Sequence, residues 1–272
     1  MYCERLKAIT LPDGLRTIGE SAFSNCDALT AVTLPGSLAS LGDYAFKACH
    51  KLARMVVRDG VPALGKNMLD QAKNLAFLYL PGDAAGIEKA GISAGTAVYA
   101  PEGSAALEAA RAAGFETVPC AGPEEVPAVR FVTEGDFEFR IVSGEAALSA
   151  YLGKEEAITV PASAGGVPVV QVLSRAVYYS RTVKSVTLPE SVRLIRDLGL
   201  QMDTSLFPCD IYVLNPDCAV ETDGIVPSFS SLGKYTVTIH AAPGGSVQLY
   251  AEKTAKQRKY LTFESWDEGT RP

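Results

Sequence analysis

A repeat of 23 residues constrains this chain more than any other feature of its sequence. Cys3, Cys26 and Cys49 begin successive units at that spacing. The first two units share their apolar, proline and glycine positions, which are Leu6 and Leu29, Ile9 and Val32, Leu11-Pro12 and Leu34-Pro35, Ile18-Gly19 and Leu41-Gly42, and Phe23 and Phe46. Agreement at that many fixed positions indicates a structural repeat. The pattern weakens gradually and ends near residue 92.

Each unit is expected to form one short strand. Ile9 and Leu11 face one side of an extended segment, while Ala8 and Thr10 face the other, because strand side chains alternate. Pro12 ends the strand by removing a backbone donor. A unit of 23 residues cannot bury its apolar face alone, so the units must stack in parallel register, roughly 4.8 Å apart. The predicted core columns are Leu6, Leu29, Leu52 and Leu75, and Phe23 and Phe46.

The full motif permits a comparison with known repeats. Leu-x-x-Ile-Thr-Leu-Pro-x-x-Leu-x-x-Ile-Gly-x-x-Ala-Phe-x-x-Cys runs from Leu6 to Cys26. It resembles the 23-residue BspA-like leucine-rich repeat, and the resemblance is specific over residues 3–57. That resemblance implies a bacterial surface protein connected with adhesion to host or matrix components.

The repeat returns later in the chain, which predicts a second module. Related stretches occupy residues 158–161 and 183–192. Each set of units leads into a strand, a turn, a serine N-cap and a helix, with Ser104 and Ser246 as the two caps. Such an element would cover the open end of a solenoid. Pro and Gly near residues 119–127 are typical of a linker.

The predicted fold class is therefore an α/β repeat protein. It is a leucine-rich-repeat solenoid with parallel strands, divided into two short modules that are each closed by a strand-turn-helix cap. Residues 1–122 form the first solenoid and its C-terminal cap. Residues 123–130 form the linker, and residues 131–272 form a second, degenerate leucine-rich repeat module with its own cap.

Composition excludes several classes of protein. The chain has 272 residues, with 25 Lys and Arg against 31 Asp and Glu, for a net charge of -6. A basic stripe that could neutralise phosphates is missing from the sequence, so we expect no nucleic-acid partner. No apolar run approaches the roughly 18 residues that cross a bilayer, so we expect no membrane insertion. The chain begins within a repeat, which leaves open a longer natural protein that carries a signal and an anchor.

Few side chains are suited to catalysis. The chain has two histidines, His50 and His240, and the usual hydrolase and zinc sites depend on that residue. His50 follows Cys49, but adjacent side chains point in different directions, so we interpret His50 as a solvated turn residue. His240 is interpreted as a surface or capping residue. We therefore expect no enzyme activity, no cofactor and no metal site.

The cysteines are interpreted as structural. Cys3, Cys26 and Cys49 would form a straight row in a solenoid, whereas a tetrahedral metal site needs thiolates that converge on one point. Buried filler is the expected role, with the thiols reduced. Cys209 and Cys218 are the candidate disulfide pair if the protein is exported, and unpaired thiols are the alternative.

The side chains opposite the core suggest a binding site. They change along the coils from small (Ala8, Thr10, Ala31, Thr33) to bulky (Arg54, Val56, Phe77, Tyr79). Arg and aromatic residues are typical of binding surfaces. We therefore predict that a partner binds at Arg54, Phe77 and Tyr79. The alternative is that the cap or the second module covers these residues.

The sequence favours a non-enzymatic protein, secreted or at the cell surface, that binds a protein or glycan ligand on the solenoid strand face. We expect it to be a monomer. One alternative is a structural spacer that projects another domain of a larger surface protein. A third hypothesis, the accessory region of an enzyme, is disfavoured by the shortage of histidine.

Overall fold

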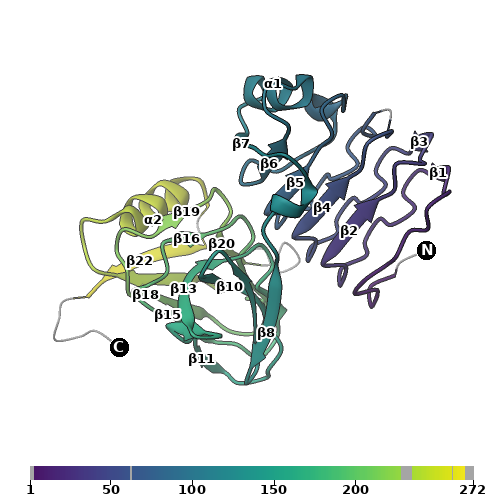
Figure 1. Cartoon of the computed structure of the whole chain (residues 1–272). Coiled ribbons are helices and arrows are strands. Elements are labelled where there is room, and N and C mark those ends of the chain that lie inside the picture. The colour runs from purple at the N-terminus through teal and green to yellow at the C-terminus, as the bar shows by residue number, and fades with distance from the viewer. Residues whose placement is uncertain (1–2, 62, 228–234, 259, 267–272) are drawn as a thin grey trace. The chain divides into compact units, whose positions relative to one another are not determined.

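The computed structural model describes residues 3–61, 63–227, 235–258 and 260–266. The chain divides into two compact units, Met1–Val129 and Arg130–Pro272 (Figure 1). Each unit has a hydrophobic core of its own. The two units are described separately below.

A parallel sheet forms one side of the first unit. Its strands are β2 (Ala31–Leu34), β4 (Arg54–Val57), β5 (Phe77–Tyr79), β6 (Ala97–Ala100) and β7 (Glu116–Pro119), in that order. The register pairs Thr33 with Val56, Val56 with Tyr79, and Tyr79 with Tyr99. A second, small sheet pairs β1 (Thr17–Ile18) with β3 (Ser40–Leu41). The strand expected near Leu6–Leu11 is reduced to a single bridge between Ala8 and Ala31.

The predicted core columns are confirmed. Leu29 and Leu52 are fully buried, and Leu75 follows them in the same cluster. Phe23 and Phe46 stack with their ring centroids 5.1 Å apart and their planes 11° from parallel. Stacked rings at this distance are expected when equivalent residues of successive coils face the same interior.

Successive coils approach too closely for a side chain at one glycine column. A Cβ atom placed on Gly65 would lie 2.3 Å from the carbonyl oxygen of Gly42, and one on Gly42 would lie 2.4 Å from the Glu20 nitrogen. No atom lies within 4 Å of such a Cβ on Gly19, at the open end of the stack. Gly42 and Gly65 are therefore required to be glycine because the backbone of the preceding coil leaves no room for a Cβ atom.

The first unit ends in a strand, a helix and a further strand. Helix α1 (Ala105–Ala112) follows β6, and the Ser104 side chain caps it by accepting a hydrogen bond from the Leu107 nitrogen at 3.2 Å. This N-cap prediction is confirmed. Ala106, Leu107 and Ala110 bury the apolar face of α1 in the core. The following strand, β7, was not predicted. Short 3-10 turns, η1 (Ile87–Lys89) and η2 (Pro123–Glu125), complete this unit.

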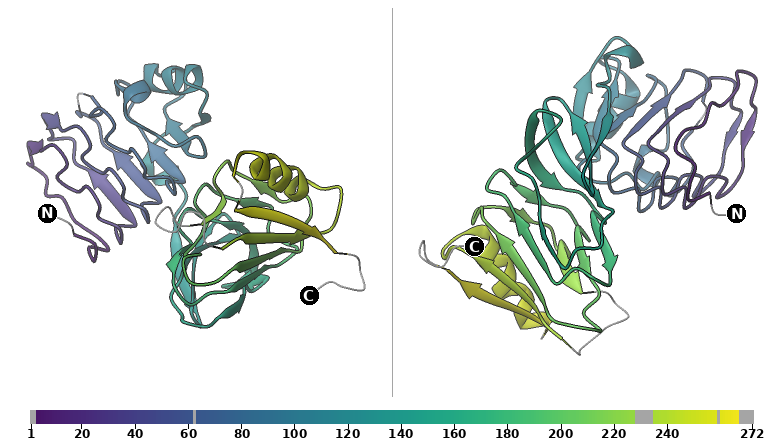
Figure 2. Two further views of the ribbon diagram at one scale, coloured as in Figure 1. Left: turned by 180° about the vertical axis from the view of Figure 1, so that it is seen from behind. Right: turned by 90° about the horizontal axis from the view of Figure 1, so that it is seen from below.

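The second unit is a solenoid whose coils have three sides (Figure 2). Three successive coils each contribute one strand to each of three sheets, and the strand pairs between these coils are parallel. The first sheet contains β11 (Ala157–Thr159), β15 (Ser185–Leu188), β18 (Cys209–Val213), β21 (Val237–Ala241) and β22 (Leu261–Ser265). The second contains β13 (Val167–Val172), β16 (Leu194–Ile195) and β19 (Ala219–Val220), and the third β14 (Val177–Ser180), β17 (Leu200–Met202) and β20 (Ile225–Pro227).

Both ends of the second unit differ from the prediction. It begins with three antiparallel strands, β8 (Arg130–Glu134), β9 (Phe137–Val142) and β10 (Glu145–Tyr151), which the repeat pattern did not predict. β10 then pairs with β13, beside which lies the short β12 (Ser163–Ala164). At the other end, α2 (Ser246–Gln257) begins after Gly245, which occupies the N-cap without a side-chain hydrogen bond. The prediction that Ser246 caps this helix is wrong.

Candidate functional site

The three residues predicted to bind a partner lie on neighbouring strands of the first unit. Arg54 begins β4 and is paired in register with Phe77, which begins β5. Phe77 is only 8% exposed and Tyr79 only 5% exposed. The Phe77 ring packs edge-on against Tyr99, with centroids 5.7 Å apart. The two aromatic residues therefore do not form the exposed surface that the sequence suggested.

The covering segment belongs to the same unit. Residues 120–126 follow β7, and the Arg54 Nη2 atom donates a hydrogen bond to the Pro123 carbonyl oxygen at 3.1 Å. Tyr79 and Pro123 line one cavity together. Burial, with the carboxylate of Asp59, raises the pKa of Tyr79, and burial lowers the pKa of Arg54. The expectation of an open patch at Arg54, Phe77 and Tyr79 is therefore wrong, since the chain after the last strand packs over it.

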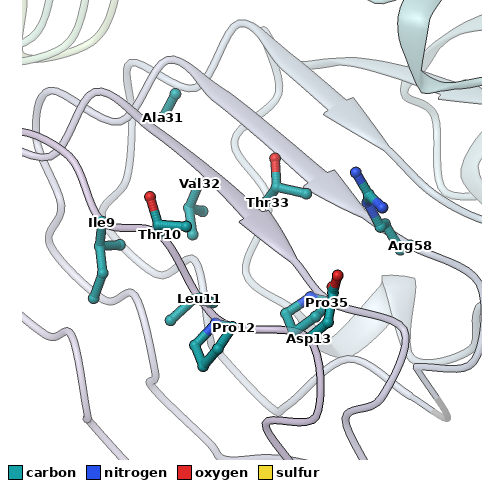
Figure 3. A pocket seen from close by; sticks show the side chains of 10 residues that line it. All are labelled: Ile9, Thr10, Leu11, Pro12, Asp13, Ala31, Val32, Thr33, Pro35 and Arg58. Carbon is teal, nitrogen blue, oxygen red and sulfur yellow. The ribbon is translucent and has the colours of Figure 1, made fainter.

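An open hollow lies beside the covered strands, over the first coils. It has a volume of about 440 Å³, and Thr10, Ala31 and Thr33 on its floor are exposed. Figure 3 shows the hydroxyl groups of Thr10 and Thr33 and the guanidinium of Arg58 pointing to the same side of the sheet. The small side chains of the first coils leave this space open, whereas the equivalent positions of later coils are occupied by the larger Val56 and Tyr79.

A second hollow of about 500 Å³ adjoins the first. Both hollows are lined by Asp13 and Arg58, and the second adds Asp59, Tyr79 and Pro123. We call this pair of hollows the strand-face groove; its exposed side chains are Thr10, Pro12, Asp13, Ala31, Thr33, Arg58 and Asp59. It ends where residues 120–126 begin to cover the sheet.

Arg58 is the principal residue that sequence reasoning missed. It stands at the strand-ending position that proline occupies in other units, at Pro12, Pro35 and Pro81. Its backbone nitrogen donates to the Leu34 carbonyl oxygen at 3.1 Å, a bond that proline could not make. In the described part of the chain, its side chain has no hydrogen bond or ion pair. The replacement of proline by arginine was the available signal.

The groove is suited to binding. Threonine hydroxyls donate and accept hydrogen bonds, and a guanidinium offers five donors in a planar fork that matches carboxylate or sulfate groups. The geometry therefore offers a rigid surface with threonine hydroxyls, the guanidinium of Arg58 and the carboxylates of Asp13 and Asp59.

Comparison with known proteins identifies the repeats. The family described as the BspA type leucine rich repeat region matches residues 1–94 in six copies. Residues 1–94 are BspA-type leucine-rich repeats. No curated protein matches the chain.

Three solved structures resemble the chain only distantly. A leucine-rich cell surface protein from Faecalibacterium prausnitzii has 15% identity and a TM-score of 0.27, over 96% of this chain and 88% of that one. A leucine-rich repeat protein from Bacteroides ovatus has 17% identity and a TM-score of 0.29, over 86% and 63%. The pneumococcal vaccine antigen PcpA has 13% identity and a TM-score of 0.28, over 93% and 71%.

The thiols of the BspA-type repeats occupy the predicted column. Cys26 and Cys49 are buried, Cys3 is exposed, and all three are free. The Cys49 sulfur donates to the Phe23 carbonyl oxygen of the preceding coil at 3.1 Å, and burial raises its pKa to about 12. The structure therefore agrees with a role as core filler.

The other thiols are also unpaired. Cys209 and Cys218 are buried and free, so they do not form the disulfide considered above. The Cys209 sulfur instead donates to the Val183 carbonyl oxygen at 3.3 Å. Among the described residues, no group of three or more histidine, cysteine or acidic side chains could hold a metal ion. No described helix has the length and apolarity needed to span a bilayer.

Both histidines are more enclosed than predicted. The His50 side chain is 12% exposed, with its Nε2 atom 3.9 Å from Asp27 Oδ1. His240 lies on the outer face of the second unit, stacked on Tyr212 at 4.5 Å and hydrogen-bonded to Asp210 Oδ1 at 2.9 Å. Trp266 stacks beside both rings. His50 therefore lies in a turn as expected but is not solvated, whereas His240 is a surface residue that aromatic neighbours partly cover.

Proposed function

We propose that this chain is a non-enzymatic protein, secreted or exposed at the cell surface, that binds a protein or glycan ligand in the strand-face groove of its BspA-type repeats. The ligand lies on Thr10, Ala31 and Thr33, and Arg58 pairs with an anionic group of the ligand. The protein acts as a monomer. This proposal replaces the site at Arg54, Phe77 and Tyr79 with the adjoining part of the same sheet face.

The observation that carries the proposal is the contrast between the covered and the open part of the strand face. Residues 120–126 pack over the bulky side chains, whereas the small side chains beside them remain exposed around about 440 Å³ of space. Arg58 borders that space with its guanidinium unpaired in the described part of the chain. The planar guanidinium can form several hydrogen bonds to one anionic group, so little side-chain entropy is lost per hydrogen bond formed.

A binding screen with two variants tests this function. Wild type is applied to arrays of glycans and of host and matrix proteins, and each ligand found is measured again with Arg58→Glu and with Thr33→Tyr, which fills the groove. We expect each change to weaken binding about tenfold or more, corresponding to about 1.4 kcal/mol. Arg16→Glu makes the same change of charge at an exposed position outside the groove and should leave affinity unchanged.

A structural spacer is the second candidate function. It is favoured by the burial of Phe77 and Tyr79, because the bulky residues that suggested a binding surface serve the packing of the unit instead. In either function, we propose that α1 and α2 close the ends of their coils, as repeat proteins need for solubility. If wild type binds nothing in the screen, or if Arg58→Glu and Thr33→Tyr bind like wild type, the proposal that ligand binds in the strand-face groove is contradicted. The spacer role is then the remaining candidate function.

A further inference from the structure

A free strand edge lies in the second unit. β11 is the outermost strand of its five-stranded sheet and pairs only with β15 (Figure 1). The Glu156 carbonyl and the Val160 nitrogen both bond to the β15 side. Backbone groups alternate in direction along a strand, so those of Ala157 and Thr159 face away from β15. Within the described ranges, no backbone or side-chain group bonds to them.

A cavity of about 410 Å³ lies along this edge. Ala157 and Thr159 line one side, and the turn between β8 and β9 lines another. Phe137 and Tyr151 supply aromatic rings with their centroids 5.2 Å apart. The Tyr151 hydroxyl accepts a hydrogen bond from the Glu155 nitrogen at 3.0 Å, which holds that ring in place. The edge therefore opens onto a preformed aromatic wall.

The charge around this cavity is negative. Glu134, Asp136 and Glu155 all line it and are exposed. Glu134 accepts a hydrogen bond from the Gly165 nitrogen at 2.7 Å, but none of the three carboxylates has an ion pair in the described part of the chain. Glu156, just outside, is already paired with Lys184 at 2.7 Å. Carboxylates beside aromatic faces favour a lysine or arginine side chain, through charge and cation–π attraction.

We propose that an extended, lysine- or arginine-containing peptide segment of a partner protein binds here as a strand added to β11. Its backbone pairs with the free groups of Ala157 and Thr159, and alternate side chains enter the cavity, because strand side chains alternate. A cationic side chain then lies between the aromatic wall and Asp136 and Glu155. This site is separate from the strand-face groove and does not depend on it.

Three labelled peptides test the proposal by fluorescence anisotropy with the full chain. The first alternates valine and lysine over six residues with blocked ends, the second has glutamate for lysine, and the third is the lysine peptide with alternate backbone nitrogens methylated. We expect the lysine peptide to bind and the glutamate peptide not to bind. We expect methylation to weaken binding about tenfold, since it removes strand pairing and keeps the charge.

Protein variants separate charge from strand pairing. Asp136→Asn with Glu155→Gln should weaken the lysine peptide about fivefold, whereas Asp217→Asn with Glu252→Gln removes the same charge from exposed positions elsewhere in the unit and should not. Thr159→Pro removes one free N–H and should weaken binding, while Thr159→Val should not. If Thr159→Pro fails to fold, the methylated peptide tests the same bond. Absence of lysine-peptide binding, equal binding of the methylated or glutamate peptide, or full affinity of the Asp136 and Glu155 variant overturns the proposal.

Discussion

Replacing Phe77 with Ser and Tyr79 with Thr distinguishes internal packing from a binding surface. Phe77 is 8% exposed and packs against Tyr99, and Tyr79 is 5% exposed and lines a cavity together with Pro123. Removing a buried aromatic side chain costs about 3–5 kcal/mol, because the lost burial is joined by a cavity. The two residues share neighbours, so their costs do not add fully, and we expect a combined loss of about 5 kcal/mol.

That loss converts into a large change in melting temperature. A unit of 129 residues has an unfolding entropy of roughly 0.27 kcal/mol/K, on the basis of about 2.1 cal/mol/K per residue. The double variant should therefore lower the melting temperature of the first unit by about 15–20 °C in differential scanning calorimetry. Ala31→Ser with Thr33→Ser changes the exposed positions of an earlier coil and should stay within about 2 °C of wild type. A double variant that melts within about 2 °C of wild type would refute the packing described here.

Three further predictions concern the coils, the helix caps and the thiols. Gly65→Ala should destabilise the first unit, because its Cβ meets the Gly42 carbonyl, whereas Gly19→Ala should be neutral or slightly stabilising by thermal melting. Ser104→Ala should cost about 1 kcal/mol by denaturant titration, and Ser246→Ala much less, because Gly245 holds the second N-cap. Burial raises the pKa of Cys49 to about 12, so the unfolded chain loses that proton first, and stability should fall as pH rises from about 9 toward 12. Cys49→Ala should make that fall shallower, and an unchanged slope would contradict the assignment.

The coils could be predicted because their pattern is local and repeated. Alternation within the strand assigned Val32 and Leu34 to the core and Thr33 to the outer face, and a fixed 23-residue period set the register and the leucine column. Every unit repeats the same constraint, so errors at one position do not shift the others. The sequence does not indicate the left-handed backbone conformation at Ser21 and Tyr44. These two residues lie at corners of their coils, and backbone hydrogen bonds to the next coil hold them there.

The covered site could not be predicted in the same way. Residues 120–126 reach Arg54 across 69 positions of sequence, and nothing local to either segment specifies that contact. Arg58 did have a signal, since it replaces the proline of the repeat. At the start of the second unit, Phe137, Phe139 and Ile141 alternate as in a strand, but this alternation does not recur at the repeat period on which the other strand predictions depend.

Cysteine footprinting tests the central claim, that ligand binds in the strand-face groove. A ligand selected on the arrays is added in excess to Thr33→Cys, and alkylation of the introduced thiol is followed by peptide mass spectrometry, which separates it from Cys3. The account predicts that bound ligand slows this alkylation about tenfold or more and leaves the rate at Arg16→Cys, outside the groove, unchanged. Equal alkylation of residue 33 with and without saturating ligand would contradict the account.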